Sequence, residues 1–114
     1  DYYIALNNRG SAKLNMNDFA GAVADFDAAL KYKPDYTLAM NNMASVYIKK
    51  REYKAAAEWA SKAIKADDKL GAAYLNRGIA KQMLRDDDGA CADWKKAAEL
   101  GINVGKSYSA GICD

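Results

Sequence analysis

Few residues in this sequence of 114 have the types and spacing that catalysis or metal binding needs. It contains no histidine, which removes the commonest general base, the triads that use one and most zinc sites. The acidic run at residues 86–88 lacks the ligand alternation and the distant glutamate of a calcium-binding loop. Asp25 and Asp27 lie two positions apart, so on a helix they point in different directions. No glycine-rich phosphate loop is present. The sequence therefore predicts no enzymatic activity, no metal and no other cofactor.

Cys91 and Cys113 are the two cysteines, and they lack the paired spacing of a zinc site. Cys91 follows the small residue Ala90, on the side of a predicted helix that should face the C-terminal tail carrying Cys113. This placement is compatible with a disulfide that pins the tail and with two small buried thiols. Because spacing does not test disulfide geometry, we favour the two buried thiols.

The charge balance does not favour nucleic acid or a membrane as a partner. The net charge is +2, and the basic run at residues 49–51 is typical of a solvated helix end. No run of 18 apolar residues is present, so we expect no transmembrane span. The chain begins with Asp1, which we interpret as a processed protein or a fragment. The sequence does not give the compartment: a soluble parent is compatible with the cytoplasm, and with the periplasm or exterior if it carried a signal peptide.

Short stretches of the sequence recur at a fixed spacing. Residues 8–13 (NRGSAK) return at 76–81 (NRGIAK), and residues 21–26 (GAVADF) return at 89–94 (GACADW). Halving this offset reveals a third copy between them, which defines three ungapped units of 34 residues at positions 3–36, 37–70 and 71–104. Each unit has the pattern of two amphipathic helices. The predicted helices span residues 3–16, 19–32, 37–50, 53–66, 71–84 and 87–100, and a short capping helix spans 105–114.

Small residues at the eighth position of each unit, namely Gly10, Ala44 and Gly78, should let the two helices of a unit approach closely. Larger apolar residues, including Phe26 and Trp94, surround them. This pattern resembles the tetratricopeptide repeat family over residues 3–104. The resemblance implies an all-α fold, a right-handed α-solenoid of three antiparallel helix pairs. The family's closing proline is present only in unit one, but this departure leaves the pattern of small residues intact.

Two charged pairs recur with the repeat. Arg9 and Asp25 in unit one correspond to Arg77 and Asp93 in unit three, whereas the middle unit has an apolar pair instead. These positions can meet between antiparallel helices. We therefore predict an ion pair within unit one and another within unit three, with bidentate geometry at best.

The family resemblance also implies a binding surface, because the first helix of each unit lines a concave groove in that family. The positions carried over are rich in asparagine, whose side chain both donates and accepts hydrogen bonds and so can bind a peptide backbone. The candidate peptide-binding residues are Asn7, Ser11, Asn15, Asn41, Asn42, Ser45, Lys49, Leu75, Asn76 and Gln82.

The best-known ligand mode of the family is a carboxylate clamp for acidic peptide C-termini, and here its three cations are missing. The five clamp positions hold Asn7, Ser11, Asn42, Ala72 and Asn76, of which only Asn42 matches. We therefore expect a protein- or peptide-binding scaffold that is not of the clamp type. The alternative is a structural spacer or assembly segment of a larger repeat protein, which would use its convex face or associate with itself through the repeat ends.

Overall fold

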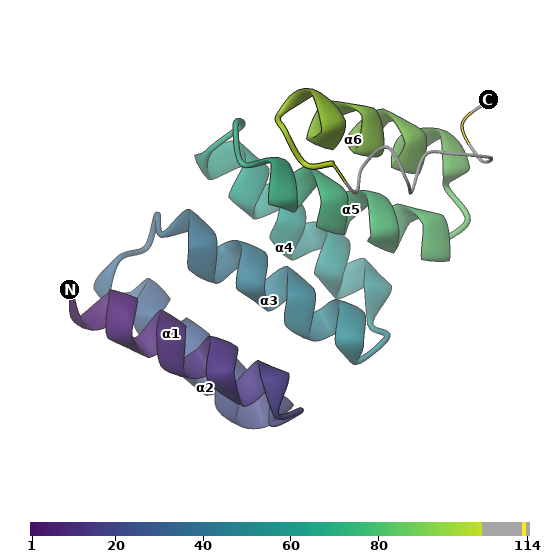
Figure 1. Cartoon of the computed structure of the whole chain (residues 1–114). Helices are drawn as coiled ribbons and strands as arrows, with labels where there is room; N and C mark the ends of the chain where they lie inside the picture. Colours follow the sequence, from purple (N-terminus) through teal and green to yellow (C-terminus); the bar gives the residue numbers. More distant parts are fainter. Residues whose placement is uncertain (104–112, 114) are drawn as a thin grey trace.

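The computed structural model describes residues 1–103 and 113, and these residues form six α-helices and no strand (Figure 1). The helices are α1 (Tyr2–Asn15), α2 (Phe19–Tyr32), α3 (Thr37–Lys49), α4 (Tyr53–Ala66), α5 (Gly71–Met83) and α6 (Asp87–Glu99). Each lies within one residue of its predicted bounds. The predicted capping helix at residues 105–114 falls almost entirely outside the described part of the chain.

The helices pack as three pairs, α1 with α2, α3 with α4 and α5 with α6, and each pair stacks on the next. In Figure 1, α1, α3 and α5 run side by side across the front, with α2 and α4 behind them. The fold is therefore an all-α helical-repeat solenoid, as the sequence predicted.

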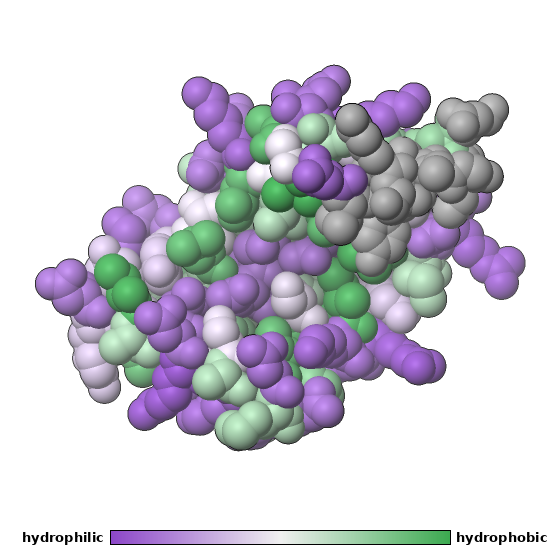
Figure 2. Space-filling model, in the orientation of Figure 1, coloured by the Kyte–Doolittle hydropathy of each residue, from purple (hydrophilic) through white to green (hydrophobic). Residues whose placement is uncertain are grey.

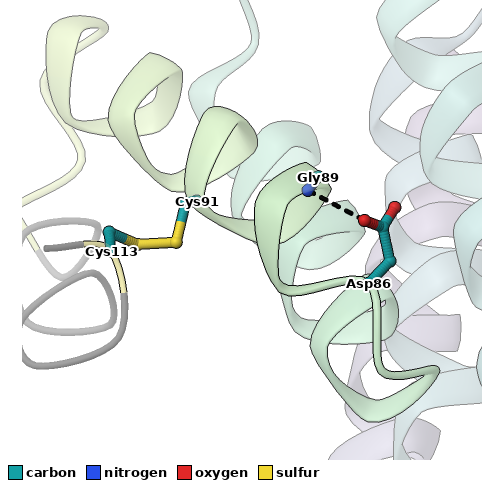
Figure 3. Close-up of a disulfide and its surroundings, with 4 residues drawn as sticks. All are labelled: Asp86, Gly89, Cys91 and Cys113. Atoms are coloured by element: carbon teal, nitrogen blue, oxygen red, sulfur yellow. Dashed lines mark hydrogen bonds between the residues drawn. A yellow bond between two sulfur atoms is a disulfide. The ribbon is translucent and has the colours of Figure 1, made fainter.

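The turn inside each unit has the same backbone geometry. Asn17, Arg51 and Arg85, at equivalent positions, have φ values of 63°, 63° and 68° in the left-handed region. The next residue is the N-cap that precedes the second helix. In units one and three this residue is an aspartate, Asp18 or Asp86, whose carboxylate accepts a hydrogen bond from the backbone N–H three residues later at 3.0 Å. Figure 3 shows the cap formed by Asp86.

The packing inside each unit depends on two facing positions. Phe26 and Trp94 are fully buried, and each ring lies against a glycine of the facing helix. A Cβ atom added to Gly10 would lie 2.7 Å from Phe26 Cε1, and one added to Gly78 would lie 2.5 Å from Trp94 Nε1. The middle unit has alanine at both positions. The two facing side chains of each unit therefore have complementary sizes: a large ring faces a glycine in units one and three, and alanine faces alanine in unit two.

The two cysteines form a disulfide, so the expectation of two buried free thiols was wrong. Cys91 on α6 is bonded to Cys113, and their Cα atoms lie 5.4 Å apart (Figure 3). This distance lies within the range that a disulfide spans. The 22-residue separation along the sequence gave no indication of it. The bond fixes Cys113 to the outer helix of unit three.

Candidate functional site

A ladder of asparagine and serine side chains joins the first helices of successive units. Asn42 on α3 donates through Nδ2 to Asn7 Oδ1 at 2.9 Å and to Ser11 Oγ at 3.3 Å, both on α1. One unit later, Asn76 on α5 donates to Asn41 Oδ1 at 2.8 Å and to the Ser45 hydroxyl at 3.1 Å. We call these six residues the asparagine ladder. It includes six of the ten candidate peptide-binding residues.

The ladder changes what these residues offer to a ligand. Asn7 and Asn41 are only 6% and 9% exposed, so they are structural acceptors more than open groove residues. An asparagine amide has two hydrogens, and the two contacts made by Asn42, like those made by Asn76, use both of them. Within residues 1–103 and 113, no group donates to Oδ1 of Asn42 or of Asn76. Asn42 and Asn76 therefore use their amide hydrogens within the ladder and leave Oδ1 unused. Asn7 and Asn41 do the reverse: their Oδ1 atoms accept, and their Nδ2 groups make no hydrogen bond among the described residues.

The other four candidate residues lie outside the ladder. Asn15 on α1 and Lys49 on α3 are exposed near the ends of their helices, and Leu75 and Gln82 on α5 are half-buried. Leu75 occupies the position that Asn7 and Asn41 hold in the other units, and Ile79 likewise replaces the serine. The ladder therefore has no further acceptor on α5, and the polar surface becomes apolar there.

The rest of the same face is mostly uncharged. Ile4, Leu38 and Met83, which occupy groove positions of the repeat, are exposed. Figure 2 shows this face with hydrophilic and hydrophobic residues interleaved. Among the ten candidate residues Lys49 is the single charged one. The face thus combines polar amides and hydroxyls with apolar side chains.

Two carboxylates that the sequence singled out are buried in ion pairs inside their units, which confirms the predicted pairs. Arg9 donates to the two oxygens of Asp25 at 2.9 and 2.7 Å, and Arg77 donates to the two oxygens of Asp93 at 2.8 Å each. A lysine one helical turn further along also contacts each carboxylate, at 3.1 Å in unit one and 3.2 Å in unit three. We had not predicted these lysines, although both stand four residues after the arginine.

Hydrogen bonding to Arg9, reinforced by Lys13, lowers the pKa of Asp25 below its ordinary range, although burial acts in the opposite direction. The carboxylate likewise raises the pKa of Arg9, and Asp93 raises that of Arg77. A carboxylate held in its charged form between two cations is suited to a structural role. It is poorly suited to act as a general base, since it has little tendency to take up a proton at neutral pH.

The described residues contain no group of three acidic or cysteine side chains that could hold a metal ion. Among the same residues, no helix is long and apolar enough to cross a membrane.

Comparisons with known proteins agree with this geometry. A family model described as "Tetratricopeptide repeat" matches residues 7–71. Human Tetratricopeptide repeat protein 6 is 31% identical over 80 residues, which cover 70% of this chain and 15% of that protein. The chain therefore spans a small part of this relative's length.

Solved structures share the fold at low sequence identity. The first TPR of Spaghetti (RPAP3), bound to the HSP90 peptide SRMEEVD, has a TM-score of 0.91 and 19% identity, with 97% of this chain and 90% of that chain covered. The first TPR domain of human RPAP3 has a TM-score of 0.92 and 19% identity, with 97% and 89% covered.

Proposed function

Because the chain belongs to the tetratricopeptide repeat family, we propose that it is a protein-binding scaffold whose face of α1, α3 and α5 binds an extended peptide segment of a partner protein. The observation that carries this proposal is the asparagine ladder. It fixes the three helices relative to one another, and a surface that is already ordered loses less conformational entropy when it binds.

The chemistry of the ladder favours one class of peptide. The amide hydrogens of Asn42 and Asn76 are used within the ladder, whereas their Oδ1 atoms are free to accept. Backbone N–H groups of a peptide can donate to these atoms, but a carboxylate can only accept. Exposed apolar residues such as Leu38 and Met83 lie on the same face. We therefore propose a segment with apolar side chains and without a cluster of acidic residues.

This proposal separates the chain from the relative whose structure contains the peptide SRMEEVD, a peptide with three acidic side chains. Three of the five clamp positions require cations in the family, and here they hold Asn7, Ala72 and Asn76. No residue of the asparagine ladder carries the positive charge that the clamp cations would supply. Binding of an acidic C-terminus by a carboxylate clamp is therefore not part of the proposed function.

The first experiment compares labelled SRMEEVD with a peptide of the same length in which glutamine and asparagine replace the acidic residues and the C-terminus is amidated. Fluorescence anisotropy with the wild-type chain should show no binding of SRMEEVD at micromolar concentrations. The variant Asn7→Lys/Ala72→Lys/Asn76→Arg, which restores the three cations, should bind SRMEEVD more tightly than the neutral peptide. Micromolar binding of SRMEEVD by the wild-type chain would overturn the proposed chemistry.

The second experiment selects ligands without assuming their sequence. A displayed library of 12-residue peptides is panned against the wild-type chain, and selected peptides are tested against Leu38→Glu and Met83→Glu. Both changes place charge on the proposed face at exposed positions and should leave helicity unchanged. Tyr32→Glu, also at an exposed position but on α2, is the matched control. Equal binding by all three variants would place the ligand elsewhere.

A further inference from the structure

Two exposed apolar side chains lie at opposite ends of the face that carries the asparagine ladder. Leu38 is 48% exposed near the start of α3, and Met83 is 52% exposed at the end of α5. Leu38 precedes Asn42 by four residues. Met83 follows Asn76 by seven residues. Because these spacings place residues on one side of a helix, both apolar side chains are on the ladder side of their helices.

The surface between these two side chains contains the contacts of Asn76 and carries no charge. The Asn76 amide donates to Asn41 Oδ1 and to the Ser45 hydroxyl, which joins α5 to α3. Within residues 1–103 and 113, no group donates to Oδ1 of Asn76. A ligand that covered this oxygen without donating to it would leave a buried acceptor unpaired, which is unfavourable. The ligand must therefore bring a hydrogen-bond donor to the middle of this surface.

This requirement favours an extended ligand over a helical one. In a helix, the backbone N–H groups bond to carbonyl oxygens of the same helix and cannot also donate to Asn76. A single extended segment makes no such bonds and keeps its N–H groups available. The face therefore suits an extended segment with an apolar side chain at each end and backbone N–H groups over Asn76.

The distance between the two apolar side chains sets their separation in the ligand. Met83 lies 11 residues beyond Ala72, the equivalent of Leu38 on α5, which is about 17 Å along the helix axis. The α5 helix contacts α3, and packed helix axes lie about 10 Å apart. The diagonal from Leu38 to Met83 is therefore about 19 Å, which an extended chain spans in about six residues. Because successive side chains of an extended strand point to opposite faces, an even separation directs both apolar side chains toward the protein.

We propose that Leu38 and Met83 select the ligand of the peptide-binding face, an extended segment of a partner protein with two apolar side chains six residues apart. This inference rests on the proposed function and adds the spacing that the ligand must have. The position of Met83 holds Asn15 in unit one and Lys49 in unit two, so unit three alone offers an apolar side chain there. A segment with its two side chains five or seven residues apart turns one of them away from the protein.

The test is a set of fluorescein-labelled 14-residue peptides made of serine, threonine and glutamine, with both ends blocked. Each peptide carries two leucines, four to eight positions apart, and fluorescence anisotropy measures its binding to the wild-type chain. The peptide with a separation of six should bind about tenfold more tightly than those with five or seven, because it buries a second leucine side chain.

Three variants assign the preference to residues. Leu38→Ser and Met83→Ser should each remove the preference for a separation of six, because one of the two contacts is lost. Both residues are exposed, so helicity should not change. Leu84→Ser is the matched control, since Leu84 is 49% exposed but lines a hollow beside α4. This control should keep the wild-type preference.

The outcomes separate this inference from the proposed function. Equal affinities at all separations, or a preference for six that survives Leu38→Ser and Met83→Ser, would overturn the inference alone. An optimum at four or at eight would also overturn it, because the same geometry gives about four residues for Ile79 in place of Met83 and about eight for Ile4 in place of Leu38. If no peptide of this set or of the displayed library binds, the proposed function and the inference both fail.

Discussion

Replacing Gly78 by alanine should destabilise the protein, although glycine-to-alanine changes inside helices normally stabilise. The usual gain is about 1 kcal/mol, because alanine is the better helix former. Here the new Cβ atom would lie 2.5 Å from Trp94 Nε1 and 2.6 Å from Cδ1. The indole is rigid and fully buried, so it cannot move aside without disturbing the packing of unit three.

The expected loss of stability is the difference between two opposing contributions to the free energy of unfolding. Overpacking a close-packed core costs about 1–3 kcal/mol, and the rigid ring places this site near the upper end. Subtracting the helix-propensity gain of about 1 kcal/mol leaves a net destabilisation of about 2 kcal/mol. For a chain of this length that corresponds to a decrease in Tm of about 8 °C. Thermal unfolding followed by circular dichroism measures the shift directly.

A double-mutant cycle tests the cause of the effect. Trp94→Ala alone should cost about 3–5 kcal/mol by leaving a cavity. In that background Gly78→Ala should become stabilising by about 1 kcal/mol, because the ring that it would strike is gone. The double variant reproduces the alanine pair that the middle unit has at residues 44 and 60. If Gly78→Ala stabilises the wild-type chain, the proposed close packing is refuted.

Three other predictions use the remaining contacts. Asn76→Ala should lower the free energy of unfolding by about 1–2 kcal/mol, because it removes the donor to the buried Asn41 Oδ1 and to the half-buried Ser45 hydroxyl; Asn8→Ala, at the equivalent but exposed position, should leave it unchanged in urea unfolding. Replacing both cysteines by serine should lower the free energy of unfolding by up to about 3 kcal/mol, because the disulfide closes a 22-residue loop. Reducing the disulfide of the wild-type chain should lower it by the same amount, and a smaller loss on reduction than on substitution would contradict this prediction. The pKa of Asp25 is lowered on folding, so its pair with Arg9 should stabilise fully above about pH 4 and progressively less as the pH falls through the lowered pKa. Unfolding of wild type and Asp25→Asn at pH 6 and pH 3 should show the smaller pH dependence in the variant.

The fold was predictable because its determinants repeat. A residue that is small in all three units, such as the alanine at 22, 56 and 90, indicates a close helix contact without any knowledge of the structure. All three of these alanines are fully buried. The charged pairs were predictable for the same reason, since two positions that change together across units are expected to meet.

The chemical state of the groove residues was not predictable from one sequence. Asn7 and Asn42 were both expected to face a ligand, but the first is buried and the second donates to it. That contact depends on how one unit stacks on the next, and stacking distance is not encoded in the pattern of a single unit. Similarly, the proximity of Cys91 and Cys113 depends on the path of the chain after α6, where the repeat has ended.

The asparagine ladder has a mechanical consequence, because it joins only the first helices of the units. Bending that flattens the array moves α1, α3 and α5 apart and must stretch the bonds made by Asn42 and Asn76. Bending in the opposite sense brings the same helices together and leaves these bonds intact. The elasticity of the array is therefore asymmetric, stiff against uncoiling and softer against tighter coiling. Under tension, the four ladder hydrogen bonds would resist the loss of curvature together with the apolar packing between units.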